Sequence, residues 1–304
     1  MIEKEPKKGQ GVYITPEEIA QITREIPRKM NLSSAAKNAS KKLGYHITRL
    51  RGRGMSFAES RAYQPGDEIR HIDWRVTART GEVYTKTFEE ERDRPVFTLV
   101  DQTSSMFIGT KRCFKAYLAA ELALSFSWLA CRNQDPFGGM FIGAEPTRTR
   151  LRSGRKHWAH YCEHLLDTNQ SWDLTQDNTQ MNWAETFRTM QQEIRPGSLI
   201  VIISDFFNHD IDPQDLFQLR AHSDVICIGV QDPIEIKPPE NAGPVGFNGN
   251  KWYYKGKGTD QQRLMKSYQN RWNSMKSMCA EMGIGFFTTS THEKALNHME
   301  AILR

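Results

Sequence analysis

The sequence predicts an α/β fold, doubly wound around a mainly parallel sheet, with a smaller N-terminal element of helix and hairpin. From residue 95 onward, short continuous apolar runs, which are typical of strands buried on both faces, alternate with segments of helical periodicity. Right-handed crossovers between such strands place helices on both faces of the sheet. Before residue 94 this alternation is absent, so we expect two parts, residues 1–94 and 95–304.

The first part is expected to contain two helical stretches and a pair of strands. The elements are, in order, helices at 15–26 and 31–44 and strands at 55–63 and 82–91. Thr15 is placed to cap the first helix, with Pro16 and Glu18 in its first turn. The residues between the two strands are rich in turn formers, which favours a hairpin-like arrangement.

The second part is expected to supply the sheet and its covering helices. The strands are predicted at 96–101, 198–207, 224–232 and 284–290, hairpins at 135–152 and within 236–258, and helices at 111–132, 155–167, 182–194, 212–223, 261–282 and 293–303. The apolar run 116–131 is shorter than the roughly 20 residues of a membrane span and contains Glu121. We therefore expect a buried helix there and no membrane span.

Composition places the chain among globular proteins, because 38% of its residues are hydrophobic and 25% are charged. The net charge of +5 is concentrated between residues 24 and 53, where nine Lys or Arg residues face a single Glu. This local excess raises a nucleic-acid partner as an alternative. Five scattered cysteines without a CxxC pair indicate reduced thiols, and the start shows no signal peptide or anchor, so a cytoplasmic protein is expected.

Two carboxylates follow buried strands directly, at the edge where α/β proteins bind their ligands. Asp101 ends the first apolar run and Asp205 ends the run that begins at residue 198. Such neighbouring carboxylates repel each other unless a cation lies between them, and Mg²⁺ prefers oxygen ligands. The hydroxyls of Thr103 and Ser105, two and four residues beyond Asp101, are placed to turn back toward such an ion.

The spacing of Asp101, Thr103, Ser105 and Asp205 resembles the metal-ion-dependent adhesion site of von Willebrand factor A domains. The resemblance implies a further ligand from a later loop, which is Thr179 here, although the glycines that usually precede it are absent. It also implies a von Willebrand A-like fold and Mg²⁺ or Mn²⁺ as the ion, and leaves open whether the ion binds before a partner does.

The segment 61–91 closely resembles the signature of a prokaryotic family, domain of unknown function fifty-eight, whose members join it to a von Willebrand A-like domain. The matching residues are Arg61, Tyr63, Gly66, Asp67, Arg70, Ile72, Asp73, Trp74, Ala78 and Arg79. Members are commonly encoded beside MoxR-type AAA+ ATPases, so the resemblance implies a partner or adaptor of such an ATPase.

Less specific features have simpler interpretations. The charged residues Asp67, Arg70, Asp73 and Arg79 are expected to form an ion network that fixes the signature segment against the main domain, with a docking surface as the alternative. His157, His160 and His164 share a helical spacing suited to a metal, but a solvated face is favoured because they lie largely away from the apolar face.

The sequence thus predicts a protein-interaction module without enzymatic activity, which binds an acidic residue of its partner through the Mg²⁺ site. A metal-dependent phosphohydrolase is a further alternative, because a strand-end Asp is the nucleophile in some phosphatases. Those enzymes use a second Asp two residues later as the general acid, and this chain has Thr103 there. A nucleic-acid-binding protein that uses the basic N-terminal region is the remaining alternative.

Overall fold

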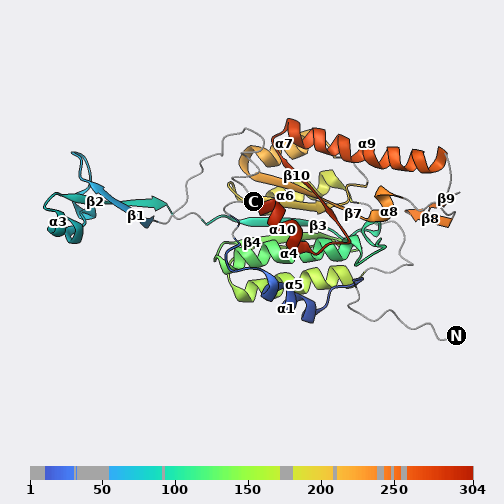
Figure 1. Cartoon of the computed structure of the whole chain (residues 1–304), viewed down its shortest axis with the longest axis horizontal. Coiled ribbons are helices and arrows are strands. Elements are labelled where there is room, and N and C mark those ends of the chain that lie inside the picture. The colour runs from blue at the N-terminus through green and yellow to red at the C-terminus, as the bar shows by residue number, and fades with distance from the viewer. Residues whose placement is uncertain are drawn as a thin grey trace. The chain divides into compact units, whose positions relative to one another are not determined.

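The computed structural model describes residues 11–30, 32, 55–90, 93–171, 181–207, 211–237, 243–247, 250–254 and 259–303. The chain divides into two compact units. The smaller comprises Thr48–Asp93, and the larger comprises the remainder, including the N-terminal helix. Figure 1 shows the elements of both units, which we describe separately.

The larger unit is built on a six-stranded sheet in the order β10-β7-β6-β3-β4-β5. Its strands are β3 (Val96–Asp101), β4 (Phe137–Ile142), β5 (Thr147–Arg152), β6 (Leu199–Ser204), β7 (Asp224–Gln231) and β10 (Gly285–Ser290). All neighbours are parallel except β4 and β5, which form the predicted antiparallel hairpin at the sheet edge. The prediction of an α/β fold with a mainly parallel sheet is therefore confirmed.

Helices cover both faces of this sheet. Alternate residues of its central strands accordingly lie in two separate cores, one on each face. Val96 and Val100 of β3 join one core, whereas Phe97 and Leu99 join the other. The first core also takes residues from α1 (Pro16–Glu25), α4 (Lys115–Arg132), α5 (Arg155–Gln170) and α10 (Ala295–Leu303). The second core takes residues from α6 (Trp183–Glu193), α7 (Pro213–His222) and α9 (Thr259–Glu281).

Helix α4 is the buried helix that the apolar run predicted. Of its residues only Trp128 and Arg132 escape full burial. In the part of the chain that the structure describes, no helix has the length and hydropathy to cross a membrane. Two short helices and a hairpin complete this unit, namely η2 (Ser104–Met106), α8 (Pro233–Ile236), and β8 (Gly243–Phe247) paired with β9 (Asn250–Tyr254).

The smaller unit is a two-stranded antiparallel sheet with a short helix between its strands. Strand β1 (Met55–Ala62) pairs with β2 (Tyr84–Glu90), and η1 (Ile69–His71) and α3 (Trp74–Thr80) connect them. Helix α3 was not predicted, although its end signals are present in the sequence. The Asp73 carboxylate accepts hydrogen bonds from the backbone of the first turn, and Gly81 closes the helix in a left-handed conformation.

The N-terminal helix α1 belongs to the larger unit, so the predicted segment 1–94 is divided in the structure. Ile19 and Ile26 lie in the same core as α4, and the Ile14 amide donates to Asn169 Oδ1 of α5 at 2.9 Å. The physical reason is the apolar stripe of α1, which a ten-residue helix cannot bury by itself. The second predicted helix, residues 31–44, lies outside the described residues apart from Leu32.

We predict that Ile19→Ala lowers the free energy of unfolding of the larger unit by about 2–4 kcal/mol, since it leaves a cavity where α1 meets α4. Chemical denaturation followed by tryptophan fluorescence measures this. Glu17→Ala, at an exposed position of the same helix, is the matched control and is expected to change little. Equal small effects for both variants would show that α1 is not part of the cooperative unit.

Candidate metal centre

The candidate site lies at the carboxyl ends of two neighbouring parallel strands. Asp101 is the last residue of β3, and Asp205 follows Ser204 at the end of β6. The short helix η2 reverses the chain after Asp101, which returns the next hydroxyl side chains to the same edge. All four predicted ligands that the structure describes are buried, with exposed fractions of 3% for Asp101, 4% for Thr103, 8% for Ser105 and 1% for Asp205.

The four side chains form one connected run of oxygen atoms. Asp101 Oδ1 accepts hydrogen bonds from the Thr103 hydroxyl at 2.7 Å and the Thr103 amide at 2.9 Å. The Thr103 and Ser105 hydroxyl oxygens are 3.4 Å apart, and Ser105 Oγ donates to Asp205 Oδ1 at 3.2 Å. The structure thus brings together the predicted residues of both strand ends, whereas Thr179 lies outside the described residues.

The backbone turn after β6 directs the Asp205 carboxylate toward this run of oxygen atoms. Phe206 has a left-handed backbone conformation (φ 49°), which is costly for a residue other than glycine. Its ring stacks on Trp183 with centroids 5.8 Å apart, and this packing holds the turn. The turn lets the Phe207 amide donate to Asp205 Oδ1 at 2.9 Å, while Ser204 Oγ donates to Asp101 Oδ2 at 2.6 Å.

A lysine that the sequence analysis missed lies beside the site. Lys115, the first residue of α4, is fully buried, and its ammonium donates to Asp205 Oδ2 at 2.7 Å and to Glu235 Oε1 at 2.8 Å. Its signal in the sequence is a lone lysine at the start of an apolar helix. Because Glu235 is 120 residues away along the chain, only the fold reveals that the two belong together.

Glu235 is itself held in place by a second set of hydrogen bonds. The Asp232 amide donates to Glu235 Oε2 at 2.9 Å, as part of a capping box at the start of α8. Asp232 is fully buried and accepts hydrogen bonds from the side chains of Thr110 and Thr291. A continuous polar network therefore runs along the strand ends, from Thr291 after β10 to Asp101 at the end of β3.

The two aspartates of the site have opposite electrostatic surroundings. Burial and the neighbouring charge of Asp205 raise the pKa of Asp101 to about 6. Burial alone would also raise the pKa of Asp205, but the positive charges of Lys115 and Arg271 outweigh it and lower that pKa. Of the two aspartates, Asp101 is therefore the one whose negative charge is less compensated.

The donor atoms fit a hard divalent cation. Two carboxylates and two hydroxyls supply oxygen only, as Mg²⁺ prefers. Adjacent ligands of an octahedral Mg²⁺ are about 3 Å apart, and the separations of 3.4 Å and 3.2 Å along the run are near this value. Within the described residues, no group of three or more His, Cys, Asp or Glu is arranged to hold a metal ion.

The predicted histidine face is only partly solvated. His160 is exposed and its Nε2 lies 3.2 Å from that of His164. His157 is half-buried, packs on the ring of Phe137 and bonds the Phe137 carbonyl at 2.9 Å, so it departs from the expected arrangement. Burial lowers the pKa of His157, which fits a structural role against the sheet.

The signature residues lie in the smaller unit but do not form the expected four-residue network. Asp67 pairs with Arg61 at 2.7 Å, whereas Arg70 pairs with Glu68. Asp73 caps α3 and accepts a hydrogen bond from Ser60 at 2.9 Å. The reason is local: short turns place each carboxylate beside its own neighbours rather than beside the next charged residue of the signature.

Other signature residues are solvent-facing or partly covered. Trp74 is 67% exposed at the start of α3. Arg79 is exposed, with no ion pair to any residue within the described ranges, and Tyr63 is half-buried. The described residues therefore show local ion pairs and caps within this unit, together with an exposed tryptophan.

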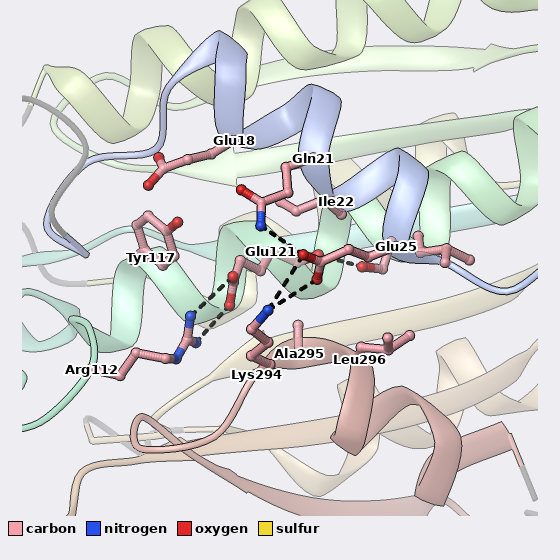
Figure 2. A pocket seen from close by; sticks show the side chains of 12 residues that line it. Glu18, Gln21, Ile22, Glu25, Arg112, Tyr117, Glu121, Lys294, Ala295 and Leu296 are labelled. Carbon is pink, nitrogen blue, oxygen red and sulfur yellow. Dashed lines mark hydrogen bonds and ion pairs between the residues drawn. The ribbon is translucent and has the colours of Figure 1, made fainter.

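A separate cavity of about 140 Å³ lies between α1, α4 and the start of α10. Figure 2 shows Arg112 pointing toward Glu121 and Lys294 pointing toward Glu25. Arg112 forms two hydrogen bonds with Glu121, at 3.1 and 2.7 Å, and Lys294 pairs with Glu25 at 3.2 Å. These two pairs compensate four of the charges in the cavity lining, and the second pair joins the residue before α10 to α1.

Comparison with known proteins assigns the family. The family model described as "Protein of unknown function DUF58" matches residues 59–269, so the chain belongs to this family. The uncharacterized protein Rv1480 of Mycobacterium tuberculosis is 30% identical over 199 residues, which cover 65% of this chain and 61% of that protein. The uncharacterized protein YeaD of Bacillus subtilis is 32% identical over 108 residues, 36% of this chain and 25% of that one.

The chain thus aligns with about three fifths of the length of its mycobacterial relative. Among solved structures, the conserved hypothetical protein BatB from Bacteroides thetaiotaomicron is similar, with a TM-score of 0.44 and 14% sequence identity. The match covers 69% of this chain and 95% of BatB. At this TM-score the similarity does not establish a shared fold.

We predict that Asp101→Asn stabilises the protein in EDTA at pH 8, because the substitution removes a buried charge that faces Asp205. The folded-state pKa of Asp101, about 6, lies above its ordinary value of 3.8, so the penalty is full above pH 6 and disappears below pH 4. The expected gain is about 3 kcal/mol at most and shrinks as the pH falls through 6.

Thermal unfolding between pH 4 and pH 8 measures this difference. Asp167→Asn, which neutralises an exposed carboxylate on α5, is the matched control and should leave the profile unchanged. If Asp101→Asn is instead less stable than the wild type at every pH, the hydrogen bonds from Thr103 and Ser204 satisfy the charge fully, and no cation is needed for compensation.

Proposed function

We propose that this member of the DUF58 family is a metal-dependent protein-interaction module with a von Willebrand A-like larger unit. The run of oxygen atoms from Asp101 through Thr103 and Ser105 to Asp205 is the observation that carries this proposal. Its donors belong to two neighbouring strand ends, where α/β folds place their ligand sites. Mg²⁺ or Mn²⁺ would be held there, with Thr179 as the remaining ligand.

The residues of the site have distinct tasks in this proposal. Asp101 supplies the less compensated negative charge of the pair, and Asp205 supplies Oδ1 on the side of Ser105. The two hydroxyls act as neutral ligands, so that two carboxylates supply the negative charge of the site. A bound divalent ion would therefore keep much of its positive charge. A bound divalent ion would supply the Lewis acidity that attracts a carboxylate of a partner. The partner's Glu or Asp would then complete the site.

A MoxR-type AAA+ ATPase, or a client that it remodels or matures, is the partner that we propose. The support is the family membership together with the signature residues of the smaller unit. We also propose a cytoplasmic location, supported by five buried cysteines, each of them a free thiol.

The site is poorly suited to phosphohydrolase chemistry, which supports a role without catalysis. A general acid must be protonated near neutral pH and free to move its proton. Thr103 stands where such enzymes have their second Asp, and its hydroxyl is bonded to Asp101. Asp205 has a lowered pKa and is bonded to Lys115, so it remains an anion and cannot donate a proton.

Nucleic-acid binding remains the alternative from another class. The basic residues that suggest it lie mainly within 33–54, outside the described residues, so the structure adds nothing in its favour. It predicts binding that falls steeply with salt and is indifferent to chelators. The metal-dependent module predicts the opposite response to a chelator.

We predict that saturating Mg²⁺ raises the thermal unfolding midpoint of the wild-type chain by a few degrees relative to EDTA, because an ion that binds only the folded state stabilises it. Asp101→Ala should abolish the shift, and Asp167→Ala, at an exposed position of α5, should retain it. A shift of equal size in Asp101→Ala would place the ion elsewhere in the protein.

The partner is tested by co-purification with the tagged wild-type chain in Mg²⁺ and in EDTA, beside Asp101→Ala. Retention of an AAA+ ATPase by the wild type in Mg²⁺ alone is expected. Equal retention under all three conditions would contradict a metal-bridged contact, and recovery of nucleic acid alone would favour the alternative.

A further inference from the structure

Lys115 occupies a position where a helix disfavours a cation. It is the first residue of α4, at the positive end of the helix dipole, and it is fully buried. Placing an ammonium group there costs free energy unless nearby anions compensate for it. Its two carboxylate partners, 2.7 and 2.8 Å away, provide that compensation. The lysine is therefore placed to neutralise these carboxylates, and it does not stabilise the helix dipole.

The two partners of Lys115 differ in what their second oxygen contacts. Glu235 has its other oxygen bonded to the Asp232 amide, and Asp232 is anchored by Thr110 and Thr291. Asp205 has its other oxygen bonded to the Phe207 amide and to the Ser105 hydroxyl, within the candidate metal centre. The ammonium is therefore shared between an anchored structural carboxylate and a carboxylate of the proposed ligand set.

We propose that Lys115 is a built-in counter-cation that sets the affinity of the site for a divalent ion, with Glu235 as its alternative partner. This inference rests on the proposed function. When a divalent cation binds the Asp205 carboxylate, Glu235 still compensates the charge of the ammonium group. When no cation is bound, the same ammonium compensates Asp205, so the fold does not depend on the metal.

The balance of charge gives the direction of the effect. Four carboxylates contribute negative charge, namely Asp101, Asp205, Asp232 and Glu235. Lys115 and Arg271 contribute two positive charges, which leaves two net negative charges. Arg271 is buried and stacks on Phe207 with its guanidinium 5.0 Å from the ring centroid. Removing the lysine charge leaves three net negative charges for a divalent ion, within a site of low dielectric.

Two substitutions should therefore move metal affinity in opposite directions. Lys115→Met keeps an unbranched side chain one atom shorter and removes the competing charge, so the affinity should rise about tenfold or more. Glu235→Gln leaves the ammonium with Asp205 as its one carboxylate partner, so the affinity should fall about tenfold. A merely structural lysine would not produce this opposite pair.

The experiment is calorimetric titration of the full chain with Mn²⁺ and with Mg²⁺ at pH 7.5, with folding checked by circular dichroism. Lys294→Met and Glu25→Gln make the same chemical changes in the ion pair that joins the residue before α10 to α1, and both variants should bind the ion like the wild type. Asp101→Ala should abolish binding. If Lys115→Met does not fold, the affinity of Glu235→Gln decides the test, because this variant keeps the ammonium paired with Asp205.

The outcomes separate this inference from the proposed function. Tighter binding by Lys115→Met and weaker binding by Glu235→Gln support the counter-cation. If the wild type binds the ion in an Asp101-dependent way but neither substitution changes the affinity, Lys115 is structural and this inference fails alone. If the wild type binds no ion, or Asp101→Ala binds equally well, the metal site fails and the proposed function fails with it.

Discussion

The repulsion between two buried carboxylates at adjacent strand ends is the constraint on which the site depends. Asp101 and Asp205 are both almost completely buried, and β3 and β6 are neighbours in the sheet. A fold tolerates such a pair only if positive charge or hydrogen-bond donors compensate for it. This protein uses two hydroxyls and one amide on Asp101 and an ammonium group on Asp205, and the resulting asymmetry leaves Asp101 as the less compensated carboxylate.

The same constraint ties distant parts of the larger unit together. Lys115 begins α4, Glu235 lies in α8, and Thr291 follows β10, yet all belong to one polar network along the strand ends. Because buried charges in such a network are costly to leave unpaired, the loops after four strands are mutually dependent in position. A change in the charge of Asp205 therefore bears directly on Glu235 and on the start of α8.

The sequence predicts the parts of this arrangement that local pattern controls. Continuous apolar runs identify the buried strands, and the residues that follow them give Asp101 and Asp205 at one sheet edge. Lys115 and Glu235 could not be predicted, because their pairing depends on how α4 and α8 pack and not on any local motif. The placement of α1 could not be predicted for the same reason, since a stripe of isoleucines shows that a helix needs an apolar surface to cover it but not which surface provides it.

The most direct test of the cation site is anomalous diffraction from crystals grown with Mn²⁺. We predict an anomalous peak bonded to the hydroxyl oxygens of Thr103 and Ser105 and adjacent to both Asp101 and Asp205, with Lys115 still within hydrogen-bonding distance of Glu235. A peak at another location would contradict the claim that this edge of the sheet is a cation site. The claim would also be contradicted if the same four side chains were ordered at saturating Mn²⁺ and no peak appeared beside them.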